Sequence, residues 1–255
     1  RDFFQVTEKL LDPASAKQTD TILKALTETL GSSVKYLPPG TEQNYNEALA
    51  ETKKRSGNGG GFKITEVGKN TAYCRIRNFN ENNTEQLQQF LDQLGGEPYQ
   101  AAVFDLRFSD GSSYDQAVAT GKILKNTQSP AAIIINGETS GAAEVFVSIA
   151  KQQSKTVLIG QPSRGMPFRL EKHVLGNGGR LLVPDRNIAG ADLSWPPAPL
   201  VPVIEIKQKL TQPQLDELNR RDFGMPRLSR DPALRRAVDL ITVIKGLANK
   251  HFQPE

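Results

Sequence analysis

The chain of 255 residues is poor in the residue types that cross-link small proteins or bind transition metals. It has one cysteine, Cys74, and only two histidines, His173 and His251. One cysteine cannot form an internal disulfide, and these three residues cannot supply a four-ligand Cys/His zinc site. A site built from carboxylates alone is not excluded by these counts, but the sequence lacks an Asp-rich loop of the calcium-binding type, and we expect no metal. No apolar run approaches the roughly 20 residues that span a bilayer, which excludes a membrane-spanning helix within these residues.

Charge of one sign is not concentrated anywhere in the chain. Lys and Arg number 32 against 28 Asp and Glu, for a formal net charge of +4. The positive excess is spread along the sequence and forms no basic arm, so we expect no nucleic-acid partner. Hydrophobic residues make up 37 % of the chain, which is ordinary for a globular protein. The length suits one sizeable α/β domain, or one domain with a small appendage.

A short glycine-rich run marks the clearest boundary in the sequence. Residues 57–61 read GNGGG, which is typical of a flexible linker. Before it, residues 1–56 carry leucines at helical spacing and are predicted to form a helical N-terminal segment. After it, residues 62–255 are predicted to form an α/β core that ends in helices.

Apolar strands alternate with amphipathic helices after the linker. Strand patterns occupy residues 62–67, 72–76, 101–106, 131–136 and 156–160, and helical patterns occupy residues 83–94, 114–124 and 142–150. This alternation, with strands that are apolar throughout, predicts parallel βαβ units covered by helices. Further along, a hairpin is predicted around residues 176–178, a last strand at 201–206, and a terminal helix with Asp231 as N-cap.

Three loops leave the carboxyl ends of the predicted parallel strands, where open α/β sheets bind their ligands. They span residues 107–113, 136–141 and 160–167, and all are rich in Gly, Ser, Thr or Asn. The second loop enters a helix N-terminus, where free N–H groups favour an anion or a developing oxyanion. Gly111 could add another N–H donor. Alternatively, these glycines serve only to make tight turns.

The same loops resemble those of the S41 peptidases, the C-terminal processing or tail-specific serine proteases. The resemblance is carried by residues 105–112 (DLRFSDGS), 136–144 (NGETSGAAE) and 160–166 (GQPSRGM), in the family's order. It covers roughly residues 62–248 and implies a ClpP/crotonase-like fold with no cofactor. It also implies a peptide or unfolded protein C-terminus as partner, and export to the periplasm or cell envelope. Most members carry a PDZ domain before the core, for which residues 57–61 leave no room.

The residues at the family's catalytic positions depart from its pattern. Gly141 stands where the nucleophilic serine is expected, and Met166 stands where the lysine base is expected. A Ser–Lys dyad needs a hydroxyl and a titratable amine, and neither residue provides one. The backbone donors matched to the oxyanion site, at Gly111, Ser112, Gly141 and Ala142, do not depend on side chains. The resemblance therefore implies a pseudoenzyme that binds a peptide or another carbonyl-bearing ligand in the former active-site cleft.

Ser140 offers an alternative, because it precedes the expected nucleophile position by one residue. It could act as a displaced nucleophile of an active serine-type peptidase, or it could cap the helix that follows. A nucleophile would also need a base. Arg164 stays protonated, while Lys172 and His173 are predicted on opposite faces of a strand.

A third interpretation is a crotonase-type enzyme acting on an acyl thioester. It requires a carboxylate facing the oxyanion donors, for which Glu138 and Glu144 are the candidates. Asp105 and Arg107 are instead predicted to make structural hydrogen bonds at a strand end. The terminal helix could pack on the core or on a second subunit, so an oligomer is compatible with the sequence.

Overall fold

The computed structural model describes residues 16–29, 34–47, 62–79, 81–152, 155–185, 198–207 and 231–250. The chain forms two compact units. The first comprises Arg1–Gly57 with Phe168–Asn187, and the second comprises Asn58–Pro167 with Ile188–Glu255. The predicted linker at 57–61 lies outside the described residues, as do residues 1–15 of the predicted helical segment.

The second unit is built on a six-stranded sheet with the order β11-β8-β7-β5-β3-β2. Its strands are β2 (Phe62–Glu66), β3 (Thr71–Ile76), β5 (Ala101–Asp105), β7 (Ala131–Ile135), β8 (Thr156–Gly160) and β11 (Ile204–Glu205). Every neighbouring pair from β11 to β3 is parallel, and β2 pairs antiparallel with β3 at one edge. The predicted α/β class with parallel βαβ units is therefore confirmed. The last strand is shorter than the predicted 201–206.

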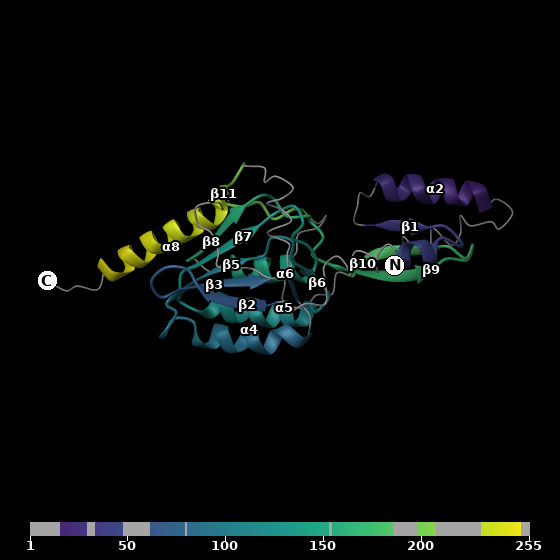
Figure 1. The fold of residues 1–255 in the computed structure, drawn as a ribbon. Helices are drawn as coiled ribbons and strands as arrows, with labels where there is room; N and C mark the ends of the chain where they lie inside the picture. The colour runs from purple at the N-terminus through teal and green to yellow at the C-terminus, as the bar shows by residue number, and fades with distance from the viewer. Residues whose placement is uncertain are drawn as a thin grey trace. The chain divides into compact units, whose positions relative to one another are not determined.

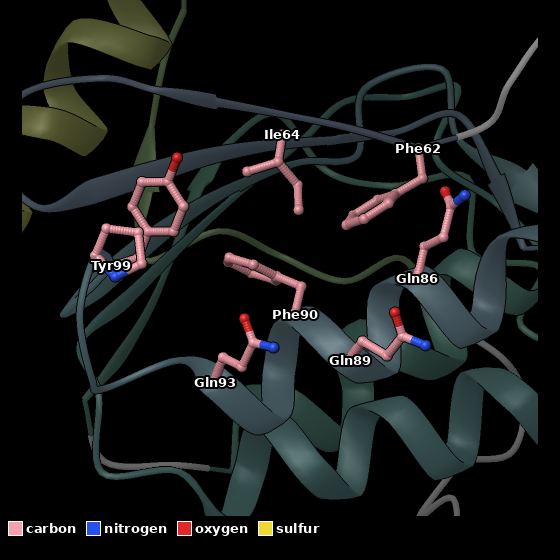
Figure 2. Close-up of a pocket in the computed structure, with 8 residues that line it drawn as sticks. Phe62, Ile64, Gln86, Gln89, Phe90, Gln93 and Tyr99 are labelled. Atoms are coloured by element: carbon pink, nitrogen blue, oxygen red, sulfur yellow. The ribbon is translucent and has the colours of Figure 1, made fainter.

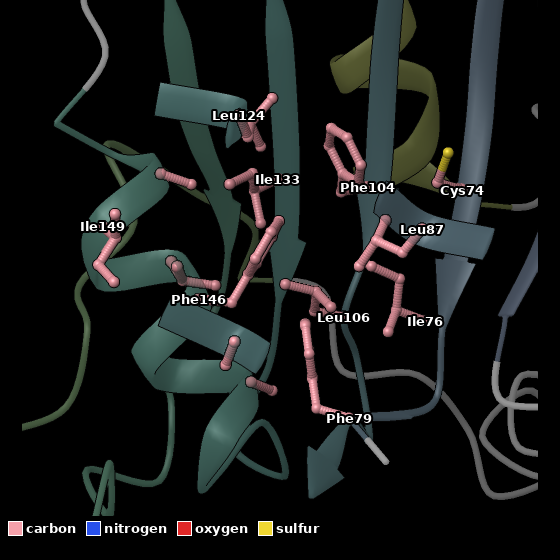
Figure 3. Close-up of a cluster of buried hydrophobic side chains, with 14 of the residues drawn as sticks. Cys74, Ile76, Phe79, Leu87, Phe104, Leu106, Leu124, Ile133, Phe146 and Ile149 are labelled. Carbon is pink, nitrogen blue, oxygen red and sulfur yellow. The ribbon is translucent and has the colours of Figure 1, made fainter. Parts of the chain in front are cut away.

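Helices cover both faces of this sheet (Figure 1). They are α4 (Glu81–Gln93), α5 (Tyr114–Asn126), α6 (Ala142–Ala150) and α8 (Pro232–Lys250). Cys74, Phe104 and Ile133 point to the face covered by α4, α5 and α6, in the cluster drawn in Figure 3. The alternate residues Val103 and Ile134 pack on the other face, against α8. The period of two along each strand thus divides the apolar side chains between two cores.

The predicted start of the terminal helix is confirmed at Asp231. Its carboxylate accepts a hydrogen bond from the N–H of Leu234 at 3.1 Å, and Pro232 is the first helical residue. This is the geometry of an acidic N-cap, with proline at a position that needs no N–H donor. Among the described residues, no helix combines the length and the apolar character needed to cross a membrane.

The first unit contains α2 (Ala16–Thr29) and a three-stranded antiparallel sheet with the order β1-β10-β9. Its strands are β1 (Lys35–Leu37), β9 (Arg169–Val174) and β10 (Arg180–Asp185). The β9–β10 pair is the predicted hairpin. Two expectations differ from the structure, because the N-terminal segment holds a strand, and the hairpin packs in this unit instead of in the core. The physical reason is that β1 hydrogen-bonds to β10, a pairing over a long sequence separation that helical spacing does not reveal.

A small core closes the first unit around Tyr36. Leu23, Tyr36 and Leu181 are buried together. The phenol hydroxyl of Tyr36 donates to the carboxylate of Asp20 and accepts from the side-chain amide of Asn177. Burial, reinforced by Asp20, raises the pKa of Tyr36 to about 12. This network joins helix, strand and hairpin turn into one unit.

Candidate functional site

The three predicted loops meet at the carboxyl ends of β5, β7 and β8, all within the second unit. The N–H of Gly141 donates to the carbonyl oxygen of Met166 at 3.1 Å. The N–H of Ser140 donates to the carbonyl of Ser109 at 2.9 Å, and the N–H of Arg164 donates to that of Thr139 at 3.0 Å. The positions matched to the family's nucleophile and base are therefore in direct backbone contact, although they are far apart in sequence.

Gly141 occupies a backbone conformation that L-residues rarely adopt. It is the N-cap of α6, with φ +60° and ψ −132°. A Cβ atom built on it would lie 2.8 Å from the carbonyl oxygen of Gly111 and 3.6 Å from the hydroxyl of Tyr114. The first distance is shorter than any ordinary van der Waals contact between a Cβ atom and an oxygen. The neighbouring loop thus occupies the space that a nucleophile's side chain would need.

Glu144 ties the start of α6 to the loop that follows β8. Its side chain is fully buried. It accepts hydrogen bonds from the hydroxyl of Ser163 at 2.5 Å and from the N–H groups of Gly165 and Met166, each at 2.7 Å. Burial raises the pKa of Glu144, and these three donors oppose the shift without reversing it. The carboxylate therefore fixes the backbone at Met166 from one side while Gly141 binds it from the other.

Ser163 extends this connection to a further segment of the second unit. Its hydroxyl accepts from the N–H of Leu200 at 2.8 Å, and its own N–H donates to the carbonyl of Leu200 at 3.1 Å. At Gly165, φ is +79°, and a Cβ atom would lie 2.9 Å from the nitrogen of Pro199. The loop 160–167 is thus held between α6 and residues 198–200 with little free space.

The loop after β5 contains a strained residue next to the site. Phe108 has φ +60°, which is unusual for a bulky side chain. Its N–H donates to the side-chain carbonyl of Asn136 at 3.0 Å, and the same oxygen accepts from the N–H of Glu138 at 3.2 Å. Asn136 therefore links the first two loops and compensates for the unusual backbone.

The predicted structural role of Asp105 and Arg107 is confirmed by their contacts. The carboxylate of Asp105 accepts from Arg75 at 2.7 Å and from Arg107 at 2.5 and 2.9 Å. Tyr73 donates to it at 2.8 Å, and Arg107 also pairs with Asp231 at the start of α8. Burial alone would raise the pKa of Asp105, but the two guanidinium groups hold it well below its usual range.

The interpretation of Ser140 as a helix cap is wrong. Helix α6 has Gly141 as its N-cap and no side-chain capping hydrogen bond. The physical reason is that the helix begins one residue later than this interpretation requires. The carbonyl of Gly141 accepts the N–H of Val145 at 3.3 Å as an N-cap carbonyl does, and glycine has no side chain that could cap. Ser140 is half-buried and contributes its backbone N–H to the loop contact instead.

The predicted backbone donors lie on the loop after β5 and at the start of α6. Gly111 lies at the site, with its nitrogen 3.7 Å from the Cβ position built on Gly141. Ser112 follows it and is exposed, and Ala142 begins α6 and is buried. The N–H groups of the first helical residues have no partner within the helix, which leaves that of Ala142 as a matched donor. Gly111, at the end of β6, is the second matched donor. The N–H of Gly141 itself is bound to Met166.

The structure accounts for the carboxylates and bases considered from the sequence. Glu138 is exposed and forms a salt bridge with Arg164. Lys172 and His173 lie on β9 of the first unit, where Lys172 pairs with Glu42. The carboxylate of Glu144 is instead enclosed by Ser163, Gly165 and Met166.

Tyr114 and Ser163 are two residues of the site that sequence reasoning missed. The hydroxyl of Tyr114, the first residue of α5, is adjacent to Gly141, and Ser163 binds Glu144. The only sequence signals were a tyrosine directly after a Gly-Ser loop and a serine in the third loop. Local pattern cannot identify such partners, because their contacts cross between loops. Among the described residues, no cluster of His, Cys, Asp or Glu could hold a metal ion.

Comparison with known proteins supports the family resemblance. The family model described as Peptidase family S41 matches residues 70–126. Carboxyl-terminal-processing peptidase 2, chloroplastic, of Arabidopsis thaliana is 21 % identical over 151 residues, which is 49 % of this chain and 28 % of that protein. The chain therefore spans less than a third of that relative's length.

Two solved structures are similar with low identity. The photosystem II D1 C-terminal processing protease has a TM-score of 0.45 at 17 % identity, with coverage of 57 % of this chain and 48 % of that one. The tricorn protease has a TM-score of 0.45 at 16 % identity, with coverage of 78 % and 19 %. The α/β fold with its parallel-rich sheet is consistent with the expected ClpP/crotonase-like class. The sequence motifs and these comparisons therefore agree that the chain is similar to the S41 peptidases, with the family model matching residues 70–126.

Proposed function

We propose that this protein is a pseudopeptidase that binds a peptide or another carbonyl-bearing ligand without hydrolysing it. The ligand binds at the loops around Gly111, Ser112, Gly141 and Ala142, which we call the Gly111–Gly141 site. The observation that carries the proposal is the contact between Gly141 and Met166. Both catalytic positions meet there through backbone atoms, and neither has a side chain that can attack a carbonyl or take up a proton. The matched donors at Gly111, Ser112 and Ala142 are backbone N–H groups, which a carbonyl or carboxylate oxygen accepts readily.

A proteolysis assay with an unfolded protein as substrate tests whether the protein lacks catalytic activity. A reduced and alkylated protein would be incubated with the wild type and with Ser140→Ala, and the products analysed by mass spectrometry. We expect no cleavage by either protein. Cleavage by the wild type that disappears in Ser140→Ala would establish an active serine peptidase with Ser140 as its nucleophile.

That alternative has one observation in its favour. The hydroxyl of Ser140 makes no capping bond at the start of α6, and the residue is half-buried beside the site. It still needs a base. Within the described part of the second unit, Arg164 is paired with Glu138 and stays protonated, and the carboxylate of Glu144 is bound by three donors. The pseudopeptidase therefore fits these contacts better.

Ligand binding at the backbone donors can be measured separately. We would titrate ¹⁵N-labelled protein with a short unlabelled peptide that ends in a free carboxylate, and follow the amide signals by NMR. Binding at the proposed site would shift the amides of Gly111, Ser112 and Ala142 most strongly. Shifts confined to other regions, or no shifts at millimolar peptide, would contradict the proposal.

Restoring the serine tests whether the site has closed around glycine. We expect Gly141→Ser to lower the free energy of unfolding by about 1–3 kcal/mol, because it adds a Cβ at positive φ beside the Gly111 carbonyl. Gly137→Ser is the matched control, since its Cβ would meet only one atom, at 3.9 Å. Equal stability of the two variants in urea would show that the loop at Gly111 moves to accommodate the added side chain at little cost in free energy.

The partner and cellular location are carried by the resemblance. The proposed ligand class is a peptide or the C-terminus of an unfolded protein. The proposed location is outside the cytoplasm, in the periplasm or cell envelope. Fractionation of cells that express the full native protein, followed by immunoblotting, would test the location, and recovery in the cytoplasmic fraction would refute it.

A further inference from the structure

A groove lies between β2 and α4 in the second unit, away from the residues that form the Gly111–Gly141 site (Figure 2). Its volume is about 440 Å³. One wall is formed by Phe62 and Ile64 of β2, and the other is formed by α4 with Gln86, Gln89, Phe90 and Gln93. This volume lies within the range of roughly 300–1,000 Å³ that is typical of ligand-binding clefts.

Aromatic rings form the interior of the groove. Phe90 is only 7 % exposed, and its ring centroid lies 6.4 Å from that of Phe62 and 6.1 Å from that of Tyr99. Phe62, Ile64 and Tyr99 are only partly buried against the core. Figure 2 shows Ile64 and Phe62 directed toward Phe90 across the space. An apolar side chain placed there would complete their burial.

The strand that forms one wall is the last in the order of the sheet. Phe62–Glu66 pairs with β3 along its whole length, and among the described residues no strand pairs with its other side. Such an edge presents alternating N–H and C=O groups, to which an extended chain can add by main-chain hydrogen bonds. Because side chains alternate along a strand, Phe62 and Ile64 face the groove together.

The lining determines the charge of the ligand. Within the described part of the chain, the residues that line the groove include no Asp, Glu, Lys, Arg or His. A charged side chain would lose hydration there without gaining an opposite charge. Gln86, Gln89 and Gln93 instead offer amide donors and acceptors at i, i+3 and i+7, which lie along one helix face. Those groups complement the polar atoms of a peptide main chain.

We propose that this groove binds an extended, uncharged peptide segment, which adds to the edge of β2 and places an aromatic or aliphatic side chain against Phe90. The partner is a protein segment of another molecule. The inference does not depend on the Gly111–Gly141 site, because the two sites share no residue.

The probe is a capped heptapeptide, acetyl-Thr-Val-Thr-Phe-Thr-Val-Thr-amide, and the control peptide is the same sequence N-methylated at alternate residues. Titration of the wild type would be followed by amide NMR and by fluorescence anisotropy of a labelled copy. We expect saturable binding and shifted amides at residues 62–66. N-methylation should weaken binding by at least about tenfold, because it removes the main-chain donors of one edge.

Two variants on α4 separate binding in the groove from binding elsewhere. Gln89→Trp fills the groove and should weaken the peptide at least about tenfold, whereas Gln88→Trp, on an exposed position that does not line it, should leave affinity within about twofold. Circular dichroism would verify that both variants are folded. Equal affinity of the two variants, or shifts centred on Gly111 and Ala142, would refute the proposal.

Hydrogen exchange tests whether the groove is open to a peptide from another molecule. Hydrogen exchange of the free protein would report whether residues 62–66 are already protected on both sides. Slow exchange of all these amides without peptide, together with no binding, would mean that the groove is filled by another part of the same chain or by a second copy. Either result would overturn the assignment to a separate peptide. Loss of binding at the Gly111–Gly141 site would leave the groove unaffected.

Discussion

Two buried carboxylates, Asp105 and Glu144, hold the two sides of the candidate site in different ways. Both side chains are fully buried. Asp105 faces two guanidinium groups, and its pKa is held well below its usual range. Glu144 is surrounded by a hydroxyl and two backbone N–H groups, and its pKa is raised. The difference shows that full charges can outweigh the loss of hydration of a buried carboxylate, whereas a few neutral dipoles only reduce it.

The difference also separates two structural tasks. The Asp105 network connects β3 and β5 to the cap of α8, and so holds the sheet to a helix. Glu144 connects α6 to the loop that carries Met166, and so positions backbone atoms at the site. The first region stabilises the fold, and the second determines the local geometry where the resemblance places catalysis.

The largest expected effect is at Asp105. Asp105→Asn removes the anion that the buried Arg75 and Arg107 share and leaves Asp231 to pair with Arg107, so we expect a loss of about 3–5 kcal/mol in the free energy of unfolding. Urea denaturation at neutral pH measures it. Asp92→Asn, at an exposed position on α4, is the control and should change stability by less than about 0.5 kcal/mol. A similar small change for both would show that the Arg75 and Arg107 charges are solvated.

A smaller effect is expected at Glu144. In Glu144→Gln the amide nitrogen cannot accept a hydrogen bond, so at least one of the donors at Gly165, Met166 or Ser163 loses its partner. We expect a loss of about 1–3 kcal/mol, smaller than for Asp105→Asn, because no buried cation is left unpaired. A larger loss than for Asp105→Asn would reverse the comparison.

As the pH falls, the stability difference between the wild type and Asp105→Asn should change in the opposite direction to the difference between the wild type and Glu144→Gln. The depressed pKa of Asp105 means that its stabilisation is present above its unfolded pKa, near 4, and is lost as pH falls through the folded value. The raised pKa of Glu144 means that its contribution is complete below its unfolded pKa, also near 4, and is lost as pH rises through the folded value.

Urea titrations from about pH 7 to about pH 3 would measure both trends. The stability gap between the wild type and Asp105→Asn should narrow at the acid end of this range. The gap between the wild type and Glu144→Gln should widen as the pH falls. Parallel behaviour of the two gaps would show that the environments of the two carboxylates are alike.

The smallest effect is expected for Glu138, an exposed carboxylate that binds the same loop after β8 as Glu144 does. Glu138 pairs with Arg164 at the surface, with side chains 55 % and 42 % exposed. Because water screens such a pair, Glu138→Gln should lower the free energy of unfolding by less than about 0.5 kcal/mol. Differential scanning fluorimetry at low and high salt would measure it, and a loss as large as that of Glu144→Gln would contradict the role of burial.

Local sequence pattern predicted the second unit well because its elements are strongly periodic. The apolar strands at 101–105 and 131–135 and the helix at 142–150 lie where the pattern placed them. The first unit was predicted less well. Lys35–Leu37 has too few residues to show a period, and its pairing with Arg180–Leu182 spans a long stretch of chain. The N-cap at Gly141 was missed because its unusual φ comes from contacts with neighbouring loops.

The sequence by itself determined the α/β class, the loops at the strand ends, and the residues Gly141 and Met166 at the two positions that the resemblance matches to a nucleophile and a base. These follow from hydrophobic period, turn residues and side-chain chemistry, which are local properties. Only the tertiary structure decided that Met166 meets Gly141 through its backbone, that the Gly111 carbonyl fills the space beside it, and that Glu144 is enclosed. The reason is physical: hydrogen-bond partners, free space and dielectric environment at this edge arise from how three loops pack together, and no single loop encodes them.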